Sequence, residues 1–203
     1  LAVGYWPWCD CMKYVGYMDN VRLWKAALPA SVVDEWQGYA ALTSLHPNVT
    51  HLIGSWLLDE TSGTTALEES GRGDMRMAIT SKQPANKLWN QTEKQLMGRK
   101  APYDAKTKTG GGGPSALRFT GHPNSRAEML NVPVVGDDDD FKVIERHLLD
   151  NREFTFEAWI KPDVLSRSYR GGQMLMQFND GGLGLMLTCK GESNFCCPQA
   201  GDN

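Results

Sequence analysis

The sequence predicts an all-β fold of antiparallel strands, arranged as a sandwich or a barrel. Short segments of alternating apolar and polar residues recur along the chain, and turns rich in Gly, Pro and Asp separate them. Long helical periodicity is almost absent, and we find no heptads or short repeats. An α/β enzyme would instead alternate strands with helical patterns of roughly 10 to 15 residues, so that class is disfavoured.

The first elements read as strand, turn and short helix. Val15, Tyr17, Val21 and Leu23 form an alternating run, and Pro29 then opens a helix-like stretch through residue 35. Residues 38 to 50 look like a connector, and the apolar run 52 to 58 is expected to begin a new domain. Polar, turn-rich segments follow at 59 to 65 and 70 to 74.

A long excursion separates these elements from the later strands. Residues 81 to 115 contain three prolines and the glycine run 110 to 113. Ordering four consecutive glycines costs more backbone entropy than a helix or strand would recover, so we expect a loop there. The pattern then predicts strands at 116–119, 128–132, 154–160, 173–178 and 183–187.

The segment 154 to 160 has the clearest two-residue period. One face carries Phe154, Phe156, Ala158 and Ile160, and the other carries Thr155, Glu157 and Trp159. The apolar face is expected to enter a core.

Size and charge allow several function classes and disfavour others. A chain of 203 residues with 41% hydrophobic and 22% charged residues can form one sizeable core, or one domain plus part of another. A net charge of −3 gives no reason to expect nucleic acid or an anionic membrane surface as a partner.

No stretch approaches the ~20 apolar residues that span a bilayer. Since Leu1 is neither Met nor followed by a signal peptide, we expect a processed product or a fragment.

The order of several segments resembles the laminin-G-like, or concanavalin-A-like lectin/glucanase, jelly roll. The matching stretches are GSWLLDETSGTT at 54–65, SGRG at 70–73, ALRFTG at 116–121 and FTFEAWIKP at 154–162. Together they cover roughly residues 52 to 188, and their order is more specific than any one of them. The resemblance implies an antiparallel β-sandwich of the jelly-roll type.

The family's closing strand is similar to residues 16 to 28, before the opening strand rather than after residue 187. We therefore expect a tandem array: residues 1–40 end one sandwich, 41–51 form a linker, and 52–203 begin a second sandwich without its last strands. The alternative is one circularly permuted sandwich, in which the first segment closes the sheet of the second.

Cysteines and sequons favour an oxidising compartment. The five cysteines gather near the two ends of the chain, without metal-type C-x-x-C pairs. Disulfides are the better interpretation, and two glycosylation sequons, at Asn48 and Asn90, agree with it. Because five is odd, at least one thiol is free or pairs outside the chain; Cys189 with Cys196 or Cys197 would close a short loop. The predicted disulfide residues are Cys9, Cys11, Cys189, Cys196 and Cys197.

Two glutamates offer the most tempting catalytic pattern. Glucanases of the resembling class carry two glutamates on one strand with an aspartate between, whereas here Thr155 lies between Glu153 and Glu157. Four residues of strand separate these carboxylates by about 13 Å, beyond the ~5 to 9.5 Å used in glycoside hydrolysis. Solvent-facing glutamates are the preferred interpretation.

Two acidic or charged motifs carry weaker hypotheses. Asp137, Asp138, Asp139 and Asp140 supply oxygen ligands suited to calcium, but no spaced ligand pattern accompanies them, so a solvated loop is preferred. The Arg-Gly-Asp sequence at 72–74 matches an integrin-type recognition motif, but it occupies a turn where the tripeptide can arise by chance.

The sequence contains no phosphate-binding loop motif and no histidine spacing typical of a metal site or a catalytic pair. The glycine run is followed by Pro114-Ser115 rather than the Lys-Ser/Thr of a phosphate-binding loop. His46, His51, His122 and His147 have no spacing suited to metal ligation or to a Ser-His pair, and are expected in turns or at the surface.

Tryptophan side chains are the better candidates for contact with a ligand, because flat aromatic faces match the apolar faces of sugar rings. Trp6, Trp8 and Trp89 lie in turn-like or loop-like surroundings and are the predicted ligand-binding residues. Trp24, Trp56 and Trp159 lie within strand motifs and are assigned to the core.

These observations favour a non-catalytic module of a larger secreted or cell-surface protein. Its expected role is adhesion, binding of glycans or protein partners, or assembly. We expect no cofactor, and calcium is the single cofactor hypothesis that the sequence leaves open. The alternatives are an accessory carbohydrate-binding domain of a polysaccharide-acting enzyme and a glucanase-like hydrolase. The fold hosts many roles, so this step rests on the resemblance.

Overall fold

The structure is a computed structural model. It describes residues 2–4, 13–37, 42, 44–58, 60, 63–70, 75–80, 89–90, 116–120, 126–129, 153–163, 173–178 and 183–187. Within these ranges the chain forms strands, one α-helix (α1, Ala30–Trp36) and one 3₁₀ turn (η1, Val49–His51).

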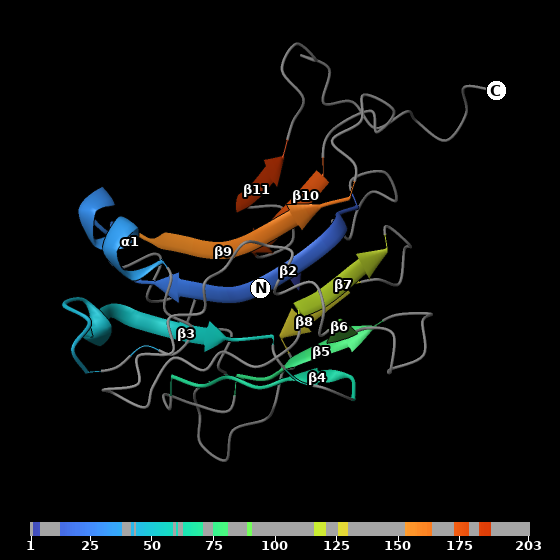
Figure 1. The fold of residues 1–203 in the computed structure, drawn as a ribbon, viewed down its shortest axis with the longest axis horizontal. Coiled ribbons are helices and arrows are strands. Elements are labelled where there is room, and N and C mark those ends of the chain that lie inside the picture. Colours follow the sequence, from blue (N-terminus) through green and yellow to red (C-terminus); the bar gives the residue numbers. More distant parts are fainter. Residues whose placement is uncertain are drawn as a thin grey trace, which may run out of the picture.

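The described strands make two sheets in which every pairing is antiparallel (Figure 1). The first sheet has the order β11 (Leu183–Leu187), β10 (Gln173–Phe178), β1 (Ala2–Val3), β8 (Arg126–Met129), β5 (Met77–Thr80) and β4 (Thr65–Ala66). The second has the order β3 (Leu52–Trp56), β2 (Val15–Trp24), β7 (Ala116–Thr120) and β6 (Trp89–Asn90), and β9 (Thr155–Pro162) also pairs with β2. The expectation of an all-β fold with antiparallel strands is confirmed.

Both sheets contribute side chains to one hydrophobic cluster. Val3, Met77 and Met176 enter it from the first sheet, and Met18 and Phe119 enter it from the second. Burial of this many large side chains is the main stabilising term, at about 1.5 to 3 kcal/mol each. The two sheets therefore share a core.

β9 contributes the apolar face that its alternation predicts. Phe154, Phe156, Ala158 and Ile160 pack against the shared core, although each is only partly buried. The opposite face of this strand is left for other contacts, and the candidate site lies there.

β2 is the strand to which three others pair. β9 runs along β2 from Gly16 to Trp24, so it occupies one edge. β7 pairs with residues 15 to 18 and β3 with residues 21 to 24, so these two strands share the opposite edge (Figure 1). A strand enclosed on both edges has no exposed ladder to template aggregation.

An irregularity in β2 shifts its alternation by one residue. Asp19 pairs with Trp159 and Arg22 pairs with Glu157, so Asn20 and Val21 together oppose the single residue Ala158. This is the arrangement of a β-bulge, and Asn20 takes the left-handed φ of 50° that asparagine tolerates.

The bulge corrects the alternation expected from the sequence. The sequence pattern grouped Val15 and Tyr17 with Val21 and Leu23, but the core residues of this strand are Met18, Val21 and Leu23. A one-residue shift moves every later side chain to the other face of a sheet. Polar residues beyond the bulge therefore point away from the core.

The first 40 residues and those after 51 belong to the same sheets. β2 pairs with β3, β7 and β9, and β1 pairs with β8 and β10. The division of a longer protein into tandem units at 1–40, 41–51 and 52–203 stays a prediction.

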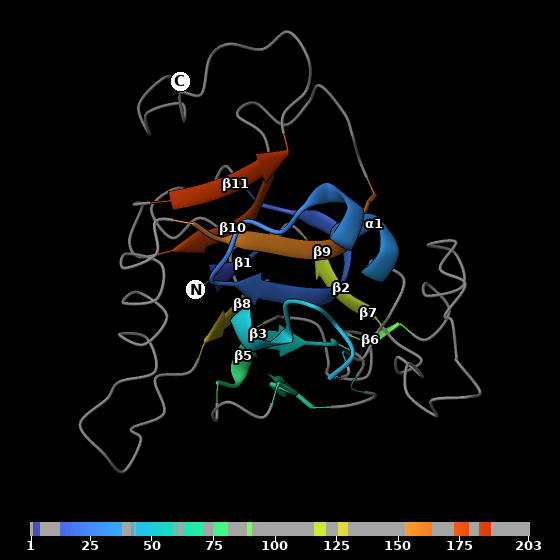
Figure 2. The same ribbon diagram turned by 90° about the vertical axis from the view of Figure 1, so that its left-hand side faces the viewer.

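The short helix also agrees with its sequence signal. α1 begins directly after Pro29, whose φ of −60° suits a helix start. Both ribbon views place α1 beside the ends of β2 and β9 (Figures 1 and 2). This position lets the helix cover one end of the outer face of the second sheet.

We predict that Gly16→Ala weakens the pairing of β2 with β9. Gly16 has a φ of 149°, and an added Cβ would lie 2.8 Å from the Cα of Pro162 and 2.8 Å from the Tyr14 hydroxyl. Backbone atoms cannot yield as a side chain can, so urea denaturation should show a loss of about 2 kcal/mol or more in the free energy of unfolding.

The matched control is Gly184→Ala. Its added Cβ would come no closer than 3.3 Å, to the flexible end of Met174. This variant should lie within about 1 kcal/mol of the wild type. Equal losses in the two variants would contradict the close approach described at Gly16.

Candidate functional site

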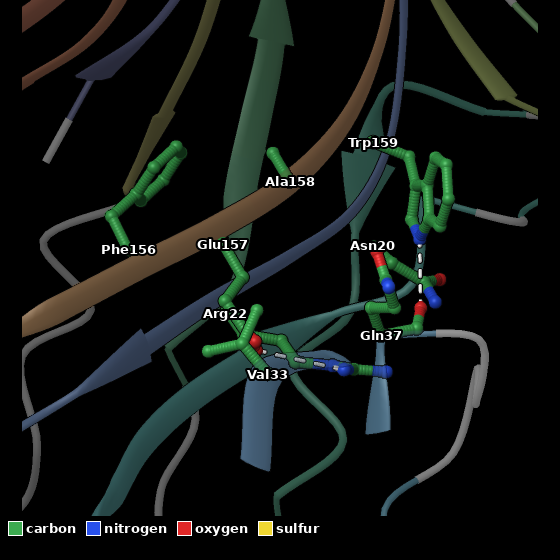
Figure 3. Close-up of a pocket in the computed structure, with 8 residues that line it drawn as sticks. All are labelled: Asn20, Arg22, Val33, Gln37, Phe156, Glu157, Ala158 and Trp159. Atoms are coloured by element: carbon green, nitrogen blue, oxygen red, sulfur yellow. Dashed lines mark hydrogen bonds and ion pairs between the residues drawn. The ribbon is translucent and has the colours of Figure 1, made fainter. Parts of the chain in front are cut away.

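A pocket of about 270 Å³ lies on the outer face of the second sheet, between β2, β9 and the end of α1 (Figure 3). Its lining residues come from these three elements: Asn20, Arg22, Val33, Gln37, Phe156, Glu157, Ala158 and Trp159. The pocket is therefore built mainly on paired strands, and the helix end supplies one wall.

The local structure explains why these side chains meet. The bulge brings Asn20 and Arg22 of β2 to the pocket. The two-residue period of β9 brings Glu157 and Trp159 to the same side. Without the shift at Asn20, the strict alternation of β2 would turn Arg22 toward the apolar core.

An ion pair closes one end of the pocket. Arg22 Nη1 lies 3.6 Å from Glu157 Oε2, and the two side chains are 3% and 14% exposed. The same Glu157 oxygen accepts a hydrogen bond of 2.9 Å from the indole Nε1 of Trp24. Glu157 is thus held from two sides, and its assignment as a solvent-facing residue is wrong; Glu153 is exposed, as expected.

Trp159 and Gln37 line another part of the pocket. Trp159 Nε1 donates a hydrogen bond of 2.9 Å to the backbone carbonyl of Gln37 (Figure 3). Asn20 lines the same pocket. The pocket therefore presents an aromatic ring beside polar groups that can donate and accept hydrogen bonds.

The assignment of three tryptophans to the core needs one correction. Trp56 is fully buried in the shared core, and Trp24 is fully buried but lies against His46 and Glu157 on the outer side. Trp159 is only partly buried and lines the pocket. The alternation of β9 had already placed Trp159 opposite Phe156, and that signal could have identified it.

Residues 25–37 and 44–51, called here the cover, pack over the same end of the sheet. Thr155 Oγ1 of β9 accepts from the backbone N–H of Leu28 at 2.9 Å and donates to the carbonyl of Ala26 at 2.8 Å. The backbone N–H of Lys25 donates to the carbonyl of His51 at 2.9 Å. These bonds attach the chain that carries Val33 and Gln37.

His46 lies at the centre of the cover. The imidazole is 2% exposed, stacks on the Trp24 ring at 4.7 Å and meets the edge of Trp36 at 4.9 Å. Its Nδ1 accepts the backbone N–H of Asn48 at 3.0 Å. Burial, and then the charge of Arg22, lower the pKa of His46. His46 lies in a turn, as one of the two expectations had it, but it is buried rather than at the surface.

A second group of polar side chains lies further along β2 and β9. The Tyr17 ring has the Arg118 guanidinium 5.0 Å and the Lys161 ammonium 5.8 Å from its centroid. Arg118 also donates to the Tyr17 hydroxyl at 2.5 Å and to Asp163 at 3.1 Å. Because these contacts satisfy one another at a partly exposed surface, they are read as stabilising the sheet.

Most of the other predicted site residues lie outside the described residues. These are Trp6, Trp8, the five cysteines (Cys9, Cys11, Cys189, Cys196 and Cys197), the acidic run Asp137, Asp138, Asp139 and Asp140, and the Arg-Gly-Asp and glycine-run motifs at 72–74 and 110–113. Trp89 and Asn90 form β6, where their backbones pair with Leu117 and Ala116. Asn48 precedes η1 and is half-buried.

Two further findings concern the described part of the chain. There, no three His, Cys, Asp or Glu side chains gather in a way that could hold a metal ion. No helix among the described residues is both long and apolar enough to cross a membrane.

Comparisons of the chain with protein-family models, with curated proteins and with solved structures returned no match.

We predict that Glu157→Gln destabilises the protein. The substitution removes the negative charge that faces the buried Arg22 guanidinium, and loss of one partner of such a pair costs roughly 3 kcal/mol. Chemical denaturation at neutral pH should show a loss of about 2 kcal/mol or more. Glu153→Gln, at an exposed residue just before β9, should change stability by less than about 0.5 kcal/mol; equal effects would mean that the pair does not form.

Proposed function

We propose that this chain is a non-catalytic binding module of a larger extracellular protein, and that its pocket binds one unit of a neutral saccharide. The observation that carries the proposal is the pocket itself, in which the ring of Trp159 lies beside Asn20, Gln37 and an internally paired Arg22 and Glu157.

The charges of the pocket favour an uncharged ligand. Its one cation and its one carboxylate, among the described lining residues, face each other at 3.6 Å. An anionic ligand would be attracted by Arg22 but repelled by Glu157, and a cationic ligand would meet the reverse. A neutral polyhydroxyl ligand suffers neither repulsion and can hydrogen-bond to both groups.

The shape and the aromatic wall favour a sugar among neutral ligands. A volume of about 270 Å³ lies just below the ~300 to 1,000 Å³ of pockets that hold drug-sized molecules. Sugar rings combine an apolar face with a hydroxyl rim, which suits an indole flanked by amides and charged groups. One ring would fill the pocket, and a longer glycan would leave along the outer face of the sheet.

The same pocket supports binding over hydrolysis. Glycoside hydrolysis requires two carboxyl groups across the scissile bond, and the described lining supplies Glu157 alone. Glu157 is also engaged by Arg22 and by the Trp24 indole, so it is not free to act on a bound sugar. An accessory carbohydrate-binding domain attached to a polysaccharide-acting enzyme would use this pocket in the same way.

The fold that we propose is a β-sandwich of the jelly-roll type. Two antiparallel sheets that share one core support it, as do the segments that resemble laminin-G-like domains. We propose an extracellular location on the two sequons and the cysteine distribution.

We predict that Trp159→Ala removes most of the saccharide affinity. Wild-type protein would be screened on an array of neutral and acidic oligosaccharides, and the best neutral binder would be measured by calorimetry. Loss of the aromatic wall should weaken binding roughly tenfold or more, equal to ~1.4 kcal/mol. Lys161→Ala is the control, because it changes the same face of β9 outside the pocket. Binding to acidic glycans alone, or equal effects of both variants, would reject the proposal.

We also predict that the protein carries glycan and disulfides when secreted. Mass spectrometry of the intact, non-reduced protein from its native source should find glycan on Asn48 or Asn90 and a disulfide that includes Cys189, Cys196 or Cys197. Bare asparagines together with five free thiols would contradict an extracellular location.

A further inference from the structure

We infer that His46 is a pH-sensitive latch that holds the cover, and with it one wall of the binding pocket, in place near neutral pH and releases it in acid. The inference deepens the proposed function, on which its relevance to binding rests. It concerns the described residues of the cover, of β2 and of β9.

The hydrogen bond at Nδ1 requires a neutral imidazole. Nδ1 accepts the Asn48 backbone N–H at 3.0 Å, so the ring hydrogen of the neutral form lies on Nε2. A protonated ring carries a hydrogen on both nitrogens and can no longer accept this bond. Protonation therefore replaces an attraction by a repulsion between two N–H groups at the turn that leads into η1.

The surroundings also disfavour the charged ring. His46 is 2% exposed between Trp24 of β2 and Trp36 of α1, so a charge there would be largely removed from water. The face of Trp24 offers some cation–π attraction, but this does not replace the lost hydration and the lost hydrogen bond. Burial and the Arg22 charge accordingly lower the pKa of His46.

The elements packed near His46 differ in the charged and titratable groups that they carry. Arg22 of β2 opposes protonation, and Arg22 is itself paired with Glu157 of β9. α1 presents Trp36 to the ring, while its Asp34 and Glu35 are exposed to solvent. His51 lies in η1, within hydrogen-bond reach of Thr50 at 3.4 Å.

The sign of the effect follows from the lowered pKa. Above the ordinary value of about 6.5 the ring is neutral whether the cover is closed or open, so the closed cover keeps its full stability. As pH falls below that value, the open form takes up a proton that the closed form resists, and opening becomes more frequent.

The size of the effect has an upper limit. If the open ring titrates at about 6.5 and the closed ring stays neutral, opening increases about 30-fold between pH 7.5 and pH 5.0. Since the cover carries Val33 and Gln37, the ligand loses one wall of its pocket when the cover opens. Affinity should therefore fall toward acid pH.

Hydrogen exchange of the whole chain tests the latch without a ligand. Amides of the cover, residues 25–37 and 44–51, would be followed by mass spectrometry at pH 7.5 and 5.0, with correction for the intrinsic pH dependence of exchange. We expect opening of the cover to rise at least fivefold at pH 5.0, while β5 and β10 stay protected. His46→Phe, which keeps an aromatic ring but cannot titrate, should remove the rise, and His51→Gln should retain it.

A second measurement keeps the test decisive if His46→Phe does not fold. The imidazole Cε1–H resonance of His46 in the wild type should titrate with a midpoint below 6.5. A midpoint at or above that value would overturn the latch, as would an equal rise of exchange in His46→Phe or simultaneous opening of β10. Because neither readout uses a sugar, failure of saccharide binding would reject the proposed ligand and leave the latch standing.

Discussion

The antiparallel pairing of β2 with β9 is the contact on which the rest of the structure depends. β2 is bounded by β9 on one edge and by β3 and β7 on the other, so it joins strands from distant parts of the sequence. The bulge within this pairing decides which side chains of β2 enter the core. Before it Met18 points inward, and after it Val21 and Leu23 do. A regular strand would instead bury Asn20 and Arg22 among apolar side chains, at a cost of several kcal/mol.

That constraint also creates the candidate site. Arg22, displaced from the core side, meets Glu157, which the alternation of β9 brings to the same face. The Glu157 carboxylate accepts a hydrogen bond from the Trp24 indole, and the Trp24 ring stacks on His46 in the cover. The cover then places Gln37 against Trp159. One irregular register thus connects the shared core, the pocket and the segment that closes it.

The sequence predicts the parts of this structure that local patterns determine. The alternation of Phe154, Phe156, Ala158 and Ile160 identifies the core face of β9, and Pro29 marks the start of α1. The bulge at Asn20 could not be predicted, because it depends on pairing with a strand some 140 residues later. The burial of His46 and the position of Glu157 depend on similar long-range contacts. Trp159 lies in a strand but on its outer face, so membership in a strand does not by itself imply burial in the core.

The most direct test of the account is a nuclear magnetic resonance titration of the protein with the neutral oligosaccharide that binds best. The account predicts shifts of the Trp159 indole N–H and of the Asn20 and Gln37 side-chain amides, which line one pocket, while the amides of β10 and β11 in the other sheet stay unchanged. Shifts confined to the first sheet, with these three groups unaffected, would contradict the claim that the register of β2 and β9 builds the binding site.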